Sequence, residues 1–310
     1  MNLKAIDDAQ KAAGELMGIR AFLILWNGSV VSENYYGGTT AETLFHLRSI
    51  TKSIVSALVG IAIEKDIISN VKDKVLTYIP ELKSQDNDAQ KERIMIRHLL
   101  TMTSGFQWIE TGEWFFSDTR SAISDAWGRP LVGSPGEVYN YDSASVDLLT
   151  VVLTRAAKQE AKTFLVENLF TPLEINHFEW EKDPAGYYRG SAGLIMRAYD
   201  LSKIGLLYLQ NGRWNQYQII SPAWVEQSTS EQVKVNDVVS YGYLWRSRRI
   251  GSIRVFYGMG YGGQYLMVVP SLKVVVTAIQ EWNVSKEQAD LQTDDFTDRV
   301  FDPMVKAWQE

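Results

Sequence analysis

The order of apolar and polar positions predicts β-strands near both ends of the chain. Two apolar, β-prone runs near the N-terminus are joined by Asn27-Gly28, a dipeptide typical of a tight hairpin. Three further runs lie near the C-terminus, and Pro270-Ser271 turns the chain between the last two. The predicted strands are residues 21–26, 30–36, 253–257, 264–269 and 274–280.

Helical patterns fill the region between these strands. Apolar residues from Ile50 to Ile63 lie on all sides of a helical projection, which predicts a helix buried on every side. Helices and loops dominate from about residue 72 to residue 181, and residues 286–308 have the pattern of a polar-faced helix. We therefore expect the fold class α+β/α, an antiparallel β-sheet covered by helices plus an all-helical lobe.

Composition is that of an ordinary soluble enzyme. The 310 residues are 45% hydrophobic, enough for one large domain or two smaller ones. The net charge is −6 without a Lys/Arg run, which argues against nucleic-acid binding, and no apolar stretch has membrane-spanning length. The absence of cysteine excludes thiol catalysis and disulfides. Residues 1–10 lack the apolar core of a signal peptide, so we expect a cytoplasmic protein, with a removed export signal as the alternative.

A serine and a lysine three residues apart stand at the start of the predicted buried helix. Ser49 and Lys52 would share one helical face, where burial disfavours the lysine cation and makes the amine a candidate base for the serine hydroxyl. The simpler interpretation is a helix-cap serine and a lysine whose amine reaches solvent. A second S-x-x-K, from Ser69 to Lys72, lies in a polar stretch that we interpret as a turn without chemistry.

Several segments resemble the penicillin-recognising serine hydrolases, in the order in which that family carries them. The segment around Ser49 resembles the nucleophile motif, and residues 135–143 resemble the second catalytic motif. Residues 257–264 stand where the third motif belongs. Further similarity lies in residues 75–82, 94–106, 191–194, 200–211 and 241–245. The family includes serine β-lactamases, DD-peptidases, related esterases and 6-aminohexanoate-dimer hydrolases.

The resemblance implies a domain division and roles for four residues. Residues 1–71 and 186–310 would form the sheet domain and residues 72–185 the all-helical domain, with the active site at their interface. Ser49 would be the nucleophile, and Tyr141 and Lys52 would move protons between it and the leaving group. Which of the two is the formal base stays open, because coupled groups titrate together. The backbone N–H groups of Ser49 and Tyr261 would form the oxyanion hole.

Two motifs depart from the lactamase pattern, and the departures bear on the substrate. Ser143 stands where asparagine is usual, and Gly258-Met259-Gly260 replaces a run of Lys or His, Thr or Ser, and Gly that anchors a substrate carboxylate. The first change argues against recognition of a β-lactam side chain, and the second argues against penicillins and D-Ala-D-Ala peptides. Ser143, Gly258, Met259 and Gly260 stay candidate substrate-binding positions. Aromatic candidates for lining an acyl or alkyl pocket, with core packing as the alternative, are Trp108, Trp114 and Trp245.

We expect a cofactor-independent serine hydrolase that acts through an acyl-enzyme on small esters or linear amides. The alternatives are a penicillin-binding-like sensor with little turnover, or a true β-lactamase or D-aminopeptidase. No G-x-S-x-G elbow of an α/β-hydrolase occurs, and the three histidines are too scattered for a metal site, so no metal is expected. The expected partner is a small ester or amide substrate, with no nucleic acid and no membrane, and the chain is expected to be a monomer or homodimer.

Overall fold

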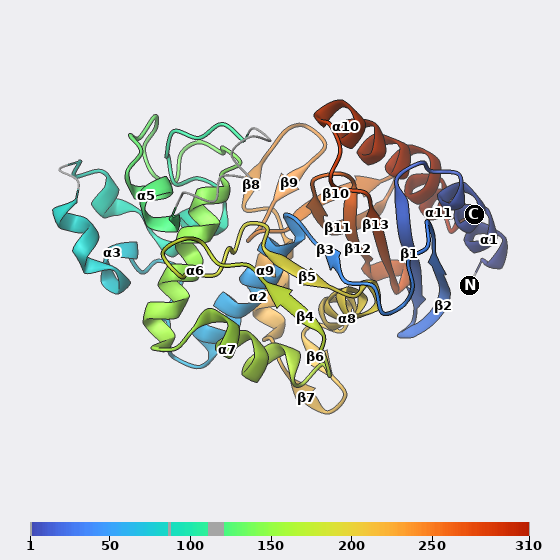
Figure 1. The fold of residues 1–310 in the computed structure, drawn as a ribbon, viewed down its shortest axis with the longest axis horizontal. Helices are drawn as coiled ribbons and strands as arrows, with labels where there is room; N and C mark the ends of the chain where they lie inside the picture. Colours follow the sequence, from blue (N-terminus) through green and yellow to red (C-terminus); the bar gives the residue numbers. More distant parts are fainter. Residues whose placement is uncertain (1, 86–87, 111–120, 310) are drawn as a thin grey trace.

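An eight-stranded antiparallel sheet forms the centre of one half of the molecule (Figure 1). The computed structural model describes residues 2–85, 88–110 and 121–309. From edge to edge the strands are β2 (Ser29–Tyr35), β1 (Ile19–Trp26), β13 (Val274–Gln280), β12 (Gln264–Val269), β11 (Ile253–Gly260), β10 (Arg246–Ile250), β9 (Ser240–Tyr241) and β8 (Val233–Lys234). Strands from the two ends of the chain lie side by side, which confirms the predicted sheet.

The hairpin between β1 and β2 forms as the sequence predicts. Asn27 and Gly28 have φ values of 50° and 87°, the positive φ that a two-residue hairpin turn requires. Along β1, Phe22 faces one apolar core and Leu23 faces another, because successive side chains of a strand point to opposite faces. Both faces of the sheet are therefore buried, and each needs a layer of helices.

One face of the sheet is covered by the two ends of the chain. Helix α1 (Leu3–Gly14) packs there with α10 (Lys286–Asp295) and α11 (Asp302–Ala307), which a π-helical turn, Phe296–Phe301, joins into one helical run (Figure 1). The termini lie close together, since the Asn2 side chain donates to the Ala307 carbonyl at 2.8 Å. The polar-faced helix predicted for residues 286–308 is confirmed.

The other face of the sheet holds α2 (Ile50–Glu64) and α8 (Ala198–Leu209). Helix α2 packs against β11 and β12 on one side and against α6 (Ser143–Ala157) on the other, and every residue from Ile50 to Ala62 is buried. The prediction of a helix buried on every side is confirmed. This position sets the first turn of α2 between the sheet and the helical part of the chain (Figure 1).

Short helices and turns make up most of residues 72–185. They are α3 (Val75–Tyr78), α4 (Ile96–Leu100), α5 (Ala122–Trp127), α6, α7 (Ala161–Leu165) and the turns Pro80–Ser84, Lys91–Arg93 and Val166–Phe170. One strand, β4 (Phe178–Trp180), also lies in this range and pairs with β5 (Leu194–Met196), which pairs with β3 (Phe45–His46). The remaining elements are β6 (Arg213–Trp214), β7 (Tyr217–Gln218), α9 (Pro222–Thr229) and the turn Pro270–Leu272. The division into two domains stays a prediction.

Candidate active site

Ser49 lies at the start of α2, directly after a residue with a strained backbone. Arg48, directly before it, has φ 52°, a conformation that costs energy in any residue with a Cβ atom. The Arg48 guanidinium lies 4.8 Å from the centroid of the Trp282 ring, and the side chain is buried. The Ser49 hydroxyl makes no capping hydrogen bond to α2, so its interpretation as a helix-cap serine is wrong.

Lys52 lies at the centre of a set of hydrogen-bond acceptors. Its residue is only 1% exposed, so the amine does not reach solvent. The Nζ atom donates to Ser49 Oγ at 2.8 Å, to Ser143 Oγ at 3.1 Å and to the Ser191 carbonyl oxygen at 2.8 Å. Two of these partners are side-chain hydroxyls and one is a backbone carbonyl. The amine thereby joins α2, the start of α6 and the segment before β5.

Glu110 extends this network beyond Ser143, and sequence reasoning missed it. The Ser143 hydroxyl donates to Glu110 Oε1 at 2.5 Å, and Trp108 Nε1 donates to the other oxygen of the carboxylate. Ser143 therefore accepts a hydrogen bond from Lys52 and passes one on to Glu110. Glu110 stands 33 residues before Ser143 in an irregular segment, so no local spacing marks it.

Asp147 supports Lys52 from the opposite side and was also missed. Ser191 donates to the Asp147 carboxylate from its backbone N–H at 2.8 Å and from its hydroxyl at 3.1 Å. Burial raises the pKa of Asp147 to about 6, although the Ser191 hydrogen bonds and the charge of Lys52 act in the other direction. Gly190 permits the close approach, because a Cβ there would lie 2.5 Å from Thr150 Cγ2.

Tyr141 lies against two cations. The Lys52 Nζ atom is 4.9 Å and the Arg246 Cζ atom 5.1 Å from the centroid of its ring. Tyr241 meets the same ring edge-on, with centroids 6.4 Å apart. Burial alone would lower the pKa of Arg246. The nearby phenols, with Tyr141 first among them, have the larger combined effect and raise this pKa above its usual value. Arg246 directly follows Trp245 in a family-like segment, which is the signal that would have found it.

Strand β11 passes directly beside the start of α2. A Cβ atom at Gly258 would lie 3.0 Å from Ser53 Oγ, and one at Gly260 would lie 2.5 Å from the Leu47 carbonyl oxygen. The two backbones approach so closely that only glycine fits at these positions. The absence of side chains at Gly258 and Gly260 therefore serves the contact between strand and helix. It also brings the turn that begins at Tyr261 up to Arg48.

The two backbone N–H groups predicted for an oxyanion hole are available. Among the residues that the structure describes, neither the N–H of Ser49 nor that of Tyr261 is donated to another residue. The Tyr261 hydroxyl donates to the Val284 carbonyl at 3.0 Å, which fixes the ring away from the strand. An oxyanion hole requires this arrangement, because its N–H groups have to be available for the substrate oxygen.

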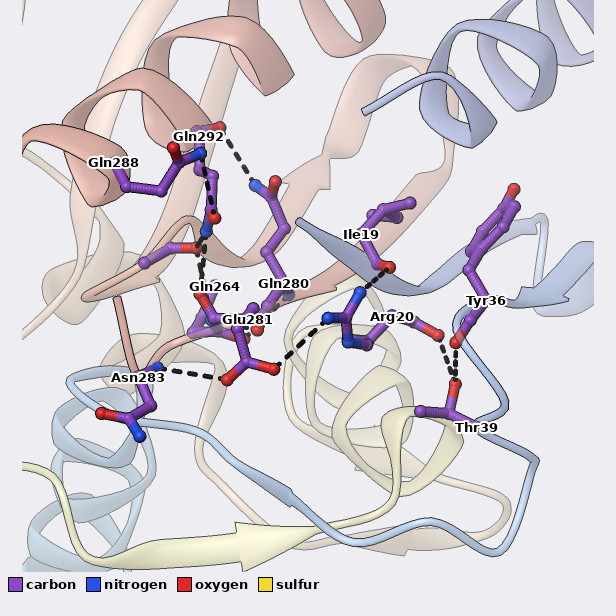
Figure 2. Close-up of polar contacts among 11 residues, drawn as sticks. Ile19, Arg20, Tyr36, Thr39, Gln264, Gln280, Glu281, Asn283, Gln288 and Gln292 are labelled. Atoms are coloured by element: carbon purple, nitrogen blue, oxygen red, sulfur yellow. Dashed lines mark hydrogen bonds and ion pairs between the residues drawn. The ribbon is translucent and has the colours of Figure 1, made fainter. Parts of the chain in front are cut away.

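Buried glutamines hold the turn that carries Tyr261 (Figure 2). Gln292 of α10 donates to the Gly262 carbonyl at 2.6 Å, and Gln280 of β13 donates to the Gly263 carbonyl at 3.0 Å. Gln264 of β12 in turn donates to the Gln280 carbonyl at 2.8 Å. Gly262 and Gly263 have φ values of 83° and 81°, so the turn needs glycine at both positions. Gln280 and Gln292 lie outside every motif and were missed.

Two predicted substrate-binding side chains lie elsewhere. Met259 packs against the core on the sheet face opposite α2, because it alternates with Gly258 and Gly260 along β11. Trp245 is fully buried, with its ring 4.5 Å from that of Tyr208. The expected substrate contact of the Trp245 ring is therefore wrong, and the alternative of core packing holds.

Trp108 is half-buried, and its hydrogen bond to Glu110 places it beside the candidate site. Arg129 Cζ lies 4.5 Å from the centroid of the Trp108 ring. Trp114 lies outside the described residues. In the described part of the chain, no group of three or more His, Cys, Asp or Glu side chains is placed to hold a metal ion. No helix in that part is both long enough and apolar enough to cross a membrane.

Similarity to known proteins covers nearly the whole chain. The sequence profile of the beta-lactamase family matches residues 10–295. Protein flp of Staphylococcus aureus (strain MW2) is 27% identical over 209 residues, which are 61% of this chain and 41% of that protein. The chain thus spans less than half the length of this curated relative. The 6-aminohexanoate-dimer hydrolase of Paenarthrobacter ureafaciens is 22% identical over 290 residues, 84% of this chain and 72% of that protein.

A solved structure has the same fold. EstCE1, described as a hydrolase with promiscuous acyltransferase activity, superposes with a TM-score of 0.79 at 17% sequence identity. The superposition covers 96% of this chain and 99% of that one. The antiparallel sheet with its covering helices is therefore shared with this hydrolase, as the sequence predicts.

Proposed function

The chain belongs to the beta-lactamase family, and on that premise we propose that it is a serine hydrolase that forms an acyl-enzyme on Ser49. The position of Lys52 carries the proposal. Its amine lies inside the protein at 2.8 Å from the Ser49 hydroxyl, and a buried lysine beside a serine without a capping role has little structural purpose. Tyr141 and the vacant N–H groups of Ser49 and Tyr261 supply the other parts that acyl transfer needs.

The reaction proceeds in two stages. Ser49 Oγ attacks the carbonyl carbon of the substrate, and the hydroxyl proton passes to a neutral Lys52 amine or to a Tyr141 phenolate. The N–H groups of Ser49 and Tyr261 bind the oxyanion that forms. The C–O or C–N bond then breaks, and the proton goes to the departing alcohol or amine. In the second stage water attacks the acyl carbon, the acid is released and the Ser49 hydroxyl is restored.

Small esters or linear amides are the proposed substrates. The third motif supplies glycine in place of the lysine or histidine that would hold a substrate carboxylate. Next to Lys52 the site presents Ser143 and the Glu110 carboxylate, groups that accept hydrogen bonds from a substrate N–H. The names of two similar proteins, a 6-aminohexanoate-dimer hydrolase and the hydrolase EstCE1, agree with a hydrolase of this kind.

The test is release of nitrophenol from p-nitrophenyl butyrate, with intact-mass spectrometry of the same samples. Ser49→Ala is expected to abolish release and the butyryl adduct of the wild type. Ser69→Ala is the matched control, because Ser69 is the serine of the other S-x-x-K but lies exposed in a turn. Lys52→Ala and Tyr141→Phe are expected to reduce turnover by at least about a hundredfold.

Each outcome separates the proposal from a rival. Sustained release that requires Ser49 supports the hydrolase and justifies a comparison of linear amides with esters, with a penicillin as the expected negative. One burst that leaves a stable adduct on Ser49 indicates a sensor that acylates without turnover. Unchanged release by Ser49→Ala removes Ser49 from the mechanism, and unchanged release by Lys52→Ala or Tyr141→Phe removes that residue.

A further inference from the structure

A second cavity, of about 290 Å³, is lined by none of the residues assigned to the candidate active site. It lies where α4, the loop before Tyr141 and the segment that contains β8 meet. The side chains that give the cavity its character are Lys72, Arg97, His98, Thr103, Gln232 and Tyr243. Among the described residues that line it, two are cationic and none is acidic. The cavity is therefore positively charged.

His98 places an unmatched hydrogen-bond donor in the wall of this cavity. His98 is 5% exposed, and its Nδ1 atom accepts the backbone N–H of Met95 at 3.2 Å. A neutral imidazole has one accepting nitrogen, and because the Met95 N–H is fixed by the backbone, we assign the accepting role to Nδ1 and the proton to Nε2. Nε2, however, lies 3.3 Å from Nε of Arg97, whose N–H points toward it. Since arginine is always protonated, this contact sets two donors against each other.

The imidazole stays neutral at physiological pH, which keeps the mismatch in place. Burial lowers the pKa of His98 to about 4, and the charges of Arg97 and Arg93 add to this. The backbone N–H of Met95 is fixed at the start of α4, whereas Arg97 is exposed and free to turn. An acceptor atom between Nε2 of His98 and the Arg97 guanidinium would satisfy both donors.

Two of the carboxylates near the cavity in sequence are engaged by other groups. Asp73, next to Lys72, accepts from the Tyr78 hydroxyl at 2.6 Å and from the Ser69 backbone N–H at 3.1 Å. Glu231, next to Gln232, accepts from the Ser240 hydroxyl. Glu137, next to Gly136, is exposed and does not line the cavity. Among the described residues that line the cavity, no carboxylate balances the charge of Arg97 and Lys72.

We propose that this cavity is a binding site for a phosphate group, either inorganic phosphate or the phosphate of a small metabolite. Arginine offers a planar pair of N–H groups that fits phosphate oxygens, lysine adds charge, and the His98 N–H completes a set of donors. A phosphate oxygen accepts from His98 Nε2 and from the Arg97 guanidinium together. The cavity is larger than a phosphate ion, which leaves room for the carbon skeleton of a metabolite.

The site also lies against the segment that leads to Tyr141. Gly136, which lines the cavity, donates its N–H to the Thr103 carbonyl at 2.7 Å, and the Asn140 N–H donates to the Met102 carbonyl at 2.9 Å. Phosphate bound to Arg97 would thus hold α4 against this segment and stabilise the folded protein by mass action. The proposal does not depend on catalysis by Ser49.

The test is titration of the whole chain with inorganic phosphate at constant ionic strength, followed by calorimetry and by imidazole ¹H–¹⁵N correlation spectra. The chain has three histidines, so the His98 signal can be assigned by its loss in His98→Gln. We expect one phosphate per chain, a His98 imidazole in the Nε2–H form, and a shift of that signal on binding. Titration with glycerol phosphate tests whether the cavity binds the phosphate of a small metabolite. Titration with acetate tests whether a carboxylate binds as well as a phosphate.

A variant of one lining cation and a control variant of a cation outside the cavity test the site. Arg97→Gln is expected to weaken phosphate binding at least about tenfold, because it removes a charge-assisted pair of hydrogen bonds. Lys74→Ala is the control, since Lys74 is an exposed cation close in sequence that does not line the cavity. No binding by the wild type, equal loss in both variants, or acetate binding as tight as phosphate would overturn the proposal. Circular dichroism confirms that Arg97→Gln is folded.

Discussion

Gln292 holds the backbone of Gly262, with its side-chain N–H donated to the Gly262 carbonyl oxygen at 2.6 Å (Figure 2). Gln292 comes from α10, on the far face of the sheet, and also donates to the Glu281 carbonyl at 2.8 Å. Gly18 makes room for it, because a Cβ there would lie 2.5 Å from the Gln292 side chain. A helix remote from Ser49 thus fixes the turn whose first N–H is the proposed oxyanion donor.

Replacement of Gln292 is expected to loosen this turn. Gln292→Leu keeps most of the volume but removes the shorter of the two side-chain donors to the Gly262 carbonyl and the donor to the Glu281 carbonyl, so the Tyr261 N–H loses its fixed direction. If the proposed function holds, kcat should fall at least about tenfold with little change in KM, since an oxyanion donor acts on the transition state. Steady-state kinetics with p-nitrophenyl butyrate measures both values. Glu287→Ala, at an exposed position of the same helix, is the control and should retain wild-type kcat.

The second prediction concerns the link from Lys52 through Ser143 to Glu110. Ser143→Ala removes the hydroxyl that accepts from Lys52 and donates to Glu110, so the amine loses one of its three fixed partners. We expect kcat to fall about tenfold to a hundredfold, the effect of one hydrogen bond to a charged group. Ser143→Thr keeps a hydroxyl and should recover most of the rate. Equal kinetics for the Ala and Thr variants would show that the hydroxyl has no part in catalysis.

The sequence predicted what depends on local pattern. The Asn27-Gly28 hairpin and the buried helix after Ser49 follow from rules that act over a few residues, and both are present. Ser49 and Lys52 are three residues apart on one helix, so their contact was predictable from helical geometry alone. The fold class followed because strands at both ends of the chain flank a helical middle.

Long-range partners were not predictable, and they make up much of the candidate site. Glu110 reaches Ser143 across 33 residues, and Arg246 reaches Tyr141 from β10, contacts that only the complete fold creates. Met259 faces the far core because strand alternation turns it away from its glycine neighbours. A motif identifies a position in the chain, but whether a side chain faces the substrate depends on packing.

The third prediction is a pH dependence of stability that arises from Asp142. Burial raises the pKa of its carboxyl to about 6, in spite of hydrogen bonds from Ser145 and Ser104. The folded state therefore holds this proton more tightly than the unfolded state. Its stabilising effect is complete at low pH and is lost as the pH rises through about 6. The full difference is about 3 kcal/mol for a shift of roughly two pKa units.

Asp142→Asn should remove this dependence, because the amide does not titrate. Urea unfolding between pH 4 and pH 8 measures the free energy of unfolding of both proteins, and the wild type should lose stability relative to the variant as the pH increases. Asp8→Asn, at an exposed position on α1, is the control and should follow the wild type. A constant difference between wild type and Asp142→Asn across the range would contradict the raised pKa.

The fourth prediction separates the two tryptophans that sequence reasoning treated alike. Trp245 is fully buried between Tyr208 and Phe256, with ring centroids 4.5 Å and 5.4 Å away, whereas Trp108 is half-buried and donates to Glu110. Trp245→Ala should lower the free energy of unfolding by about 3–5 kcal/mol, the cost of a large cavity. Trp245→Phe should restore part of it.

Trp108→Ala should affect the kinetics more than the stability of the fold. Loss of its N–H removes one of the donors to the Glu110 carboxylate, so kinetic parameters for p-nitrophenyl esters should change, while the free energy of unfolding falls by less than in Trp245→Ala because the Trp108 ring is only half-buried. Urea unfolding and steady-state kinetics on the same preparations give both quantities. Altered acyl-chain preference in Trp245→Phe with unchanged stability would contradict the assignment of the Trp245 ring to core packing alone.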